Sequence, residues 1–403
     1  MLEGSELRVA IDARFLDGHQ GGVQQTVIGL ASGLARLEGP ERYLFLVYPG
    51  SAEWLRPHLG PGAELLPLRS GQGRRLALMA HARAPRLLRS AMRAAFERMP
   101  IGVPDSDGTI EAAGAQVMHF TQQAGFRTPV PSIYVPQDLQ HVHLPEMFTA
   151  HERRWREVTY PALAQQAALV VAQSQAGRDD VVRHLGVAPE RVRVIPYASV
   201  LEAYPDPTPQ EIEGLRSRLG LPGPFALYPA QTWKHKNHLG LLEALAQLRD
   251  RLGTRVPVVF TGRRNDFFPV VARRVEELGL GAQVRFLGYV SPKELKALYR
   301  MARALVVPSR FEGFGMPVVE AFGAGLPVAC SSAPALPETA GGAALLFDPG
   351  DVTAMAAAIQ RIWTDEDLRR DLTARGRERG RQLSWLEVAR QYRDLYRTVA
   401  GRR

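Results

Sequence analysis

The sequence has a single cysteine, Cys330, and no long apolar run among its 403 residues. One cysteine excludes a disulfide within the chain, and no other feature supports thiol catalysis. No apolar stretch approaches the ~20 residues that cross a bilayer. Residues 1–8 also lack the basic and then apolar layout of a signal peptide. We therefore expect a cytoplasmic protein.

Acidic residues are the minority charge, with 41 Asp and Glu against 50 Lys and Arg, for a net charge of +9. Such an excess suits a nucleic acid, an anionic membrane face or an anionic small ligand as partner. A GC-rich genome, which tends to produce arginine-rich proteins, accounts for it equally well. No zinc-ligand spacing, RNA-binding aromatic set or recognition-helix pattern accompanies the charge, so nucleic acid is not expected as a partner.

Apolar runs of strand length alternate with amphipathic stretches of helical period along the whole chain, which predicts an α/β fold with parallel strands. In the first half, strands are predicted at residues 7–12, 43–48, 117–120, 132–135 and 192–195. In the second half, they are predicted at residues 225–228, 256–260, 284–287 and 305–307. A chain of this length exceeds one comfortable core, so two Rossmann-like domains are expected.

A proline-punctuated segment separates the two halves and predicts a linker. The expected domains are therefore residues 1–200 and 223–384, with a linker at 201–222. Residues 385–403 carry apolar side chains at helical spacing and predict a final amphipathic helix.

Residues 308–320 form the most informative segment, in which Glu312 and Glu320 flank a Gly-Phe-Gly turn. The segment follows a short apolar strand, and Pro317 suits the first turn of a helix. A strand, a glycine-containing loop and a helix N-terminus together form an anion site. A carboxylate beside a phosphate is unfavourable, so the two glutamates are better suited to the neutral hydroxyls of sugars and ribose.

This segment resembles the signature of family 4 retaining glycosyltransferases, and the similarity continues through residues 324–328, 336–339 and 347–351. The resemblance implies the GT-B architecture, in which two Rossmann-like domains face each other across a central cleft. It implies a nucleotide-diphosphate sugar, such as a GDP- or UDP-sugar, as donor, and a glycan or lipid-linked acceptor. It also implies that the last helix crosses back to the N-terminal domain. No Asp-Xaa-Asp motif stands at a strand end, so neither a metal nor another cofactor is expected.

By the same resemblance, Glu320 is the candidate for the ribose hydroxyls and Glu312 for donor-sugar hydroxyls near the anomeric carbon. The backbone N–H groups of Gly313, Phe314 and Gly315 would then face the sugar or the diphosphate.

Lys236 occupies the position at which the family carries a lysine that binds the donor diphosphate. It precedes Asn237, which is predicted to cap a helix that begins at His238. Many relatives have an arginine where this chain has Ala230, so the second phosphate-binding cation stays open. The candidates are Lys234, Arg263 and Arg264, with Gly262 allowing close backbone approach.

In the N-terminal half, Gly21 and Gly22 either let the backbone approach the diphosphate or form a simple turn before a helix. Residues 136–146 are similar to a family segment on the acceptor side. Relatives often have His-Asp at its start, and Gln137 of this chain cannot take a proton. Asp138, His141 and His143 are the alternatives for that role.

Three other functions remain open. A glycoside hydrolase would use Glu312 and Glu320 as a carboxylate pair that flanks the scissile bond at ~5–10 Å. The others are a nucleotide-sugar epimerase and a catalytically silent sugar-nucleotide sensor.

Residues 85–99 predict a basic amphipathic helix. Such a helix either lies at the inner, anionic face of the membrane or packs on the first domain as an ordinary surface helix.

Overall fold

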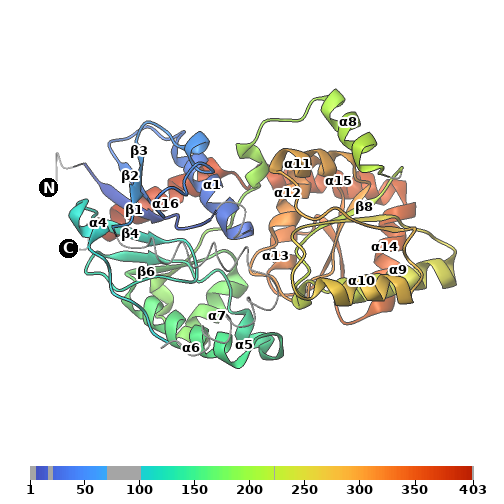
Figure 1. Ribbon diagram of the computed structural model, residues 1–403, viewed down its shortest axis with the longest axis horizontal. Helices are drawn as coiled ribbons and strands as arrows, with labels where there is room; N and C mark the ends of the chain where they lie inside the picture. Colours follow the sequence, from blue (N-terminus) through green and yellow to red (C-terminus); the bar gives the residue numbers. More distant parts are fainter. Residues whose placement is uncertain (1–5, 17–20, 70–100, 222, 402–403) are drawn as a thin grey trace. The chain divides into compact units, whose positions relative to one another are not determined.

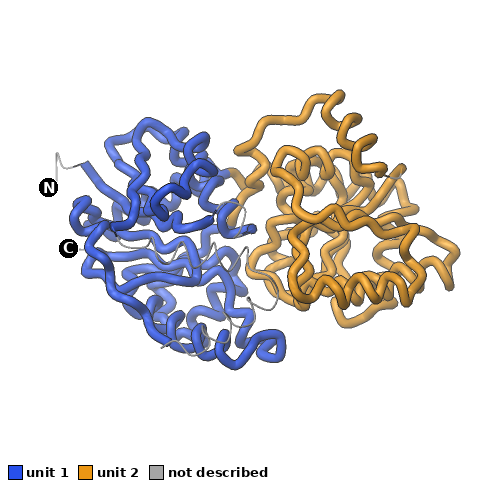
Figure 2. Tube along the Cα trace, in the orientation of Figure 1, with its two compact units in different colours: residues 1–196, 385–403 blue, residues 197–384 orange. Residues whose placement is uncertain are grey.

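The computed structural model describes residues 6–16, 21–69, 101–221 and 223–401, so the amphipathic helix predicted at 85–99 lies outside the described residues. The chain divides into two compact units (Figure 2). Unit 1 comprises Met1–Pro196 and Trp385–Arg403, and unit 2 comprises Tyr197–Ser384. Within the described ranges, no helix is both long enough and apolar enough to span a bilayer.

Unit 1 is built on a parallel sheet of seven strands in the order β3-β2-β1-β4-β5-β6-β7. The chain moves outward from β1 in one direction and then returns to build outward from β4 in the other, which is a doubly wound sheet. The strands are β1 (Arg8–Asp12), β2 (Arg42–Val47), β3 (Ala63–Pro67), β4 (Val117–Phe120), β5 (Ser132–Tyr134), β6 (Leu169–Ala172) and β7 (Val192–Val194).

Two helices of unit 1, α6 and α7, have caps that the sequence supplies. Thr149 and Glu152 form a capping box at the start of α6, and Gly186 ends α7 in the left-handed conformation with φ 64°. The helices are α1 (Gly22–Leu34), α4 (Thr109–Ala112), α5 (Gln140–His143), α6 (Ala150–Gln166), α7 (Gln175–Leu185) and α16 (Trp385–Ala400). Short 3-10 helices lie at Arg56–His58, Pro145–Met147 and Pro189–Arg191.

The last helix, α16, packs against α1 within unit 1. The contact depends on two glycines of α1 that leave room for the first residue of α16. A Cβ on Gly29 would lie 2.0 Å from Cε2 of Trp385, and a Cβ on Gly33 would lie 2.2 Å from its carbonyl oxygen. Trp385 itself is 1% exposed, so the two helices share one well-filled interface.

Unit 2 repeats the same plan with six parallel strands in the order β10-β9-β8-β11-β12-β13. Helices cover both faces of the sheet, with α9, α10 and α14 on one face and α11, α12 and α15 on the other (Figure 1). The strands are β8 (Ala226–Pro229), β9 (Val258–Thr261), β10 (Val284–Phe286), β11 (Ala304–Val307), β12 (Val328–Ser331) and β13 (Ala344–Phe347). The helices are α8 (Pro209–Leu219), α9 (His238–Leu252), α10 (Phe268–Glu277), α11 (Pro292–Met301), α12 (Met316–Ala324), α13 (Leu336–Ala340), α14 (Val352–Thr364) and α15 (Glu366–Arg381), with 3-10 turns at Val200–Ala203 and Lys234–Lys236.

The segment that the prolines predict to be a linker, residues 201–222, contains helix α8 and belongs to unit 2. Pro209 does not interrupt structure here, because it occupies the first turn of α8 beside a capping box formed by Thr208 and Glu211. Ion pairs tie the helix to α11, including one of 2.5 Å between Lys293 Nζ and Glu211 Oε1.

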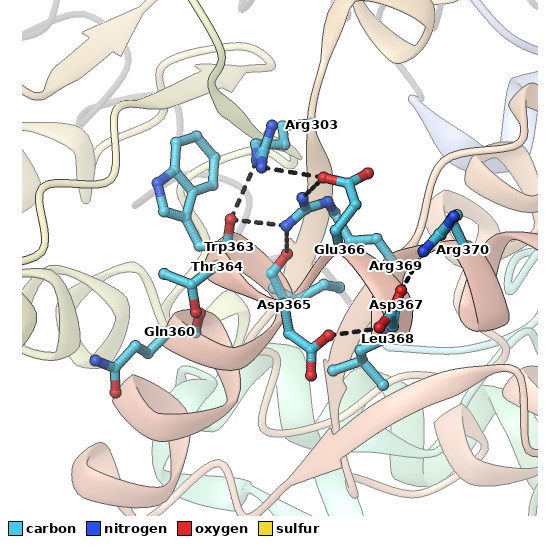
Figure 3. A network of polar contacts seen from close by, with 11 residues as sticks. Arg303, Gln360, Trp363, Thr364, Asp365, Glu366, Asp367, Leu368, Arg369 and Arg370 are labelled. Carbon is cyan, nitrogen blue, oxygen red and sulfur yellow. Dashed lines mark hydrogen bonds and ion pairs between the residues drawn. The ribbon is translucent and has the colours of Figure 1, made fainter.

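A buried arginine joins the end of α14 to the start of α15 (Figure 3). Arg369 is 6% exposed, and its Nη1 donates to the carbonyls of Ile362 at 3.0 Å and Trp363 at 2.7 Å. Arg303, which precedes β11, donates to the same Trp363 carbonyl at 3.1 Å, and both arginines pair with Glu366. The last carbonyls of α14 therefore find donors, and the helical layer is fixed to the sheet.

Candidate functional site

Apart from Glu320, which lies in α12, the predicted donor-site residues of unit 2 lie in loops that follow the carboxyl ends of β8, β9 and β11. Strands β8 and β11 are neighbours although the chain builds away from each in opposite directions. Such a switch point leaves a crevice between the two following loops, and ligands of open α/β sheets bind there.

The two loops at the switch point meet through an ion pair. Lys236, in the loop after β8, places its Nζ 2.7 Å from Oε1 of Glu312, in the loop after β11. Their side chains are 20% and 11% exposed, so both charges are largely removed from water. The structure thus brings together two residues that the sequence places 76 positions apart.

The side chain of Asn237 hydrogen-bonds to the loops around this pair, and its predicted role as a helix cap is wrong. It was predicted to cap α9 with its side chain, but it makes no such bond. Its Nδ2 instead donates to the carbonyls of Pro308 and Pro349, each at 3.0 Å. The backbone of Asn237 is left-handed, with φ 56°, a conformation that asparagine tolerates better than most residues. That turn aims its amide at the neighbouring loops rather than at the first N–H groups of α9.

Buried hydroxyl groups also hold the same two loops in place by hydrogen bonds. Tyr228 at the end of β8 donates to the Lys236 carbonyl at 2.8 Å and lies 3.2 Å from Oγ of Ser309. Ser331 of β12 donates to the Ser309 carbonyl at 2.5 Å. Sequence reasoning assigned no role to these hydroxyl groups, because their partners lie on other segments of the chain.

The glycine turn before α12 is held by its surroundings. Phe314 is buried, its ring packs edge-on against Tyr197, and its carbonyl accepts a hydrogen bond from Thr339 at 2.5 Å. Gly315 has φ 98°, and a Cβ there would lie 2.5 Å from Cδ2 of Leu336. Only glycine satisfies both conditions. Gly313 lies in the same turn, two residues before Gly315.

Glu320 lies in α12, where it is 7% exposed. Its Oε2 accepts a hydrogen bond from the hydroxyl of Tyr299 in α11 at 2.7 Å. Burial raises the pKa of Glu320 to about 7, and the Tyr299 hydrogen bond opposes that rise. Tyr299 is a further residue that sequence reasoning did not identify.

Aromatic rings accompany the candidate second cations. Lys234 Nζ lies 6.0 Å from the ring centre of Phe267, and the Arg263 guanidinium lies 5.5 Å from that of Tyr289. Arg264 lies 4.6 Å from the ring centre of Phe268.

Gly262 brings the loops that carry these cations together. It has φ 111°, and a Cβ there would lie 2.8 Å from backbone atoms of Ala230 and Gln231. The glycine was predicted to allow backbone approach to a ligand, and the close approach observed here is to the loop after β8. Lys234 and Arg263 therefore belong to two loops in direct backbone contact.

In unit 1, the carboxyl end of β1 carries a buried charge pair. Asp12 is 0% exposed and accepts from Arg14 at 2.8 Å and 2.7 Å through its two carboxylate oxygens. Gly21 precedes α1 with φ 53°, which requires glycine, whereas a Cβ on Gly22 would meet nothing within 4 Å. Gly21 is thus needed for its backbone conformation, whereas Gly22 faces open space.

The predicted acceptor-side residues lie in two different environments. Asp138 pairs with Arg156 at 3.2 Å, with both side chains partly exposed. His141 is 5% exposed, and its ring packs edge-on against Phe148 and Tyr160. Burial, with help from nearby positive charge, lowers the pKa of His141 to about 4.

Gln137, which stands where relatives often carry histidine, has a structural role. Its Nε2 donates to the Thr121 carbonyl at 2.6 Å, and its φ is 69°. The side chain is thereby directed at the end of β4.

Comparison with known proteins agrees with this geometry. Residues 215–379 match the family model of glycosyl transferases group 1. O-antigen chain mannosyltransferase B of Escherichia coli is 31% identical over 280 residues, which cover 67% of this chain and 73% of that protein. The serotype-specific mannosyltransferase WbdA of Escherichia coli is 30% identical over 228 residues, but these cover only 28% of that longer protein.

A solved structure shares the fold over almost the whole chain. HepE of Anabaena, in complex with UDP and glucose, superimposes with a TM-score of 0.73 at 20% identity, over 98% of this chain and all of that one. The predicted α/β fold of two Rossmann-like domains is confirmed. On this evidence the chain belongs to the glycosyl transferases group 1, glycosyltransferases of the family 4 type with the GT-B fold.

Proposed function

We propose that this glycosyltransferase moves a sugar from a nucleotide-diphosphate donor to an acceptor hydroxyl, with retention of the anomeric configuration and without a metal on the diphosphate. The observation that carries the proposal is the Lys236–Glu312 pair at the switch point between β8 and β11. A cation for phosphate and a carboxylate for sugar hydroxyls lie there within one hydrogen bond of each other.

The donor would replace the ion pair with two separate contacts. The diphosphate takes the ammonium of Lys236, assisted by the positive end of α12. Glu312, released from the lysine, accepts hydrogen bonds from hydroxyls of the donor sugar. Glu320 accepts from the ribose hydroxyls, at a position where burial makes a charged hydrogen bond worth about 1.5–3 kcal/mol.

In the proposed reaction, the bond between the anomeric carbon and the diphosphate oxygen breaks while the acceptor oxygen bonds to the same carbon from the same face. The acceptor proton moves to a diphosphate oxygen, so no protein nucleophile is needed. Lys236 stabilises the charge that grows on the leaving diphosphate. Asp138 and His141 are proposed to contribute on the acceptor side.

Two relatives guide the choice of donor. One is a mannosyltransferase by name, and HepE was solved with UDP and glucose. We therefore propose a GDP- or UDP-sugar as donor and a glycan or lipid-linked acceptor. In keeping with the sequence, the enzyme is proposed to act in the cytoplasm.

A thermal-shift screen against UDP, GDP, ADP, dTDP and their sugars tests the proposal. A ligand at one hundred times its Kd stabilises the folded state by about 2.7 kcal/mol, which is readily seen. We expect one base to stabilise the protein selectively. A protein that no nucleotide stabilises, or that hydrolyses simple glycosides without nucleotide, contradicts the proposal. An epimerised donor sugar formed without acceptor would identify the epimerase alternative.

A further inference from the structure

Two histidines and an aspartate of unit 1 converge in a cluster that contains neither Asp138 nor His141, the residues proposed for the acceptor side, although His143 was the third candidate there. His143 ends α5, and Asp180 and His184 lie one turn apart on α7. One ligand atom from each of the three lies within 4.8 Å of the others. We propose that these residues bind a divalent transition-metal ion of the zinc class, which clips α5 to α7.

The distances fit a metal centre with a small adjustment. Nε2 of His143 lies 2.8 Å from Oδ2 of Asp180, and Nε2 of His184 lies 3.9 Å from Oδ1 of the same carboxylate. Ligands about 2.0–2.2 Å from a tetrahedral zinc stand roughly 3.3–3.6 Å from each other. The two separations run to different oxygens of the Asp180 carboxylate and lie on either side of that value, and the ligand atoms of all three residues lie within 4.8 Å of one another. Side-chain shifts of about 1 Å would therefore complete the site.

The kind of ligand selects the kind of ion. Two imidazoles and one carboxylate suit Zn²⁺, Co²⁺, Ni²⁺ or Cu²⁺, whereas Mg²⁺ and Ca²⁺ prefer all-oxygen sites. Three protein ligands leave a fourth position for water. The side chains of His143, Asp180 and His184 are 34%, 15% and 29% exposed, so an ion can reach them from solvent.

The helix spacing explains how the chain provides such a site. Residues four apart on a helix lie on the same face, which places Asp180 and His184 side by side. The two imidazoles of His143 and His184 approach edge-on with ring centres 5.8 Å apart, so that both can direct Nε2 at the same carboxylate.

An ion bound between His143, Asp180 and His184 would connect two helices of unit 1. Helix α5 has four residues, contains His141 and begins two residues after Asp138. A bound metal would tether that short helix to the longer α7 (Figure 1). The site belongs to unit 1 and shares no residue with the Lys236–Glu312 pair of unit 2.

The test uses the full chain, stripped with a chelator and dialysed. Titration with Co²⁺ reports tetrahedral coordination by its visible absorption, and calorimetry with Zn²⁺ reports stoichiometry. We expect one ion per chain. Combining Asp180→Asn with His184→Gln should weaken binding at least about a hundredfold, because ligand loss exceeds the tenfold to hundredfold cost of losing an outer partner.

Asp179→Asn is the matched control, since it makes the same change one residue away at a side chain that accepts from Gln175 at 2.8 Å. It should bind the metal as the unaltered chain does. Undiminished binding in the double variant overturns the proposal, as does a chain that binds no ion stoichiometrically and holds these groups only by hydrogen bonds.

A measurement on the unaltered chain covers the case in which the double variant fails to fold. Zn²⁺ should slow amide hydrogen exchange in α5 and α7. Zinc-dependent protection confined to other segments would place the ion elsewhere and contradict the proposal.

Discussion

Glu320 is a carboxyl group that its surroundings push toward the neutral form, although the proposed role requires the charged form. Burial raises its pKa to about 7, while the Tyr299 hydroxyl supplies one hydrogen bond to the carboxylate. Ribose hydroxyls would add further donors and draw the group back to its ionised state. Nucleotide binding and the charge of Glu320 should therefore be coupled.

That coupling gives a pH-dependent prediction. Only ionised Glu320 accepts from two hydroxyls, so nucleotide affinity should fall as the pH drops through about 7, by roughly tenfold between pH 8 and pH 6. Glu320→Gln should bind more weakly at pH 8, by about tenfold to a hundredfold, and should lose this part of the pH dependence.

Calorimetry with the selected nucleoside diphosphate at several pH values measures both effects. The phosphate's own titration is common to the two proteins and cancels in their difference. Parallel pH profiles for Glu320→Gln and the unaltered chain would refute the role in ribose binding.

Substitution of Lys236 or Glu312 should lower the rate more than it weakens binding. Lys236→Ala should lower kcat by about a hundredfold or more with a smaller loss of donor affinity, because the diphosphate charge grows as the bond breaks. Glu312→Ala should leave free-nucleotide binding intact and lower turnover. Steady-state kinetics with calorimetry decide this point, and a Lys236→Ala variant that loses only affinity would contradict it.

At the scale of elements, the central strands and the glutamate motif could be predicted because their signals are local in sequence. Strand β3 escaped prediction because Glu64 and Pro67 interrupt its apolar residues at a partly buried sheet edge. Strand β13 also lies at an edge, but its residues are all apolar, so its run could have been recognised. Helix α8 escaped because its prolines indicate a linker until a capping box is considered. Tyr228 and Tyr299 reach the site from other elements, and such long-range contacts leave no mark in a local pattern.

The contact between α1 and α16 predicts contrasting effects of one substitution. Gly29→Ala should destabilise unit 1 by about 1–3 kcal/mol or more, because its Cβ would overlap the Trp385 ring. Gly22→Ala, in the same helix, meets open space and should change stability by less than about 1 kcal/mol. Urea denaturation measures both, and equal effects would show that the close packing of Trp385 does not limit position 29.

At the scale of the whole molecule, the family match at residues 215–379 falls within unit 2, which also carries the Lys236–Glu312 pair. Lys236, Glu312 and Glu320 thus share one compact unit, whereas the candidates Gly21 and Gly22 lie in unit 1. Unit 1 holds the acceptor-side candidates and the His143, Asp180 and His184 cluster. The proposed metal site and the Lys236–Glu312 pair therefore belong to different units.

Chelation should therefore leave transfer active. Initial rates measured in excess EDTA should stay within about twofold of those without it, because Lys236 and helix N-termini supply the positive charge for the diphosphate. A loss that Mg²⁺ or Mn²⁺ restores would refute the metal-free account. If only Zn²⁺ restores the lost activity, and if His184→Gln causes the same loss, the lost activity depends on a metal bound by His143, Asp180 and His184.

The central claim is retaining transfer from a nucleotide-diphosphate sugar, and the configuration of the first product tests it most directly. The donor chosen by thermal shift is incubated with enzyme, with a glycan acceptor or with water as the default acceptor, and proton NMR follows the anomeric signal before mutarotation. The account predicts a product with the anomeric configuration of the donor and one nucleoside diphosphate released for each sugar transferred. An inverted product, or transfer without nucleoside diphosphate release, would contradict it.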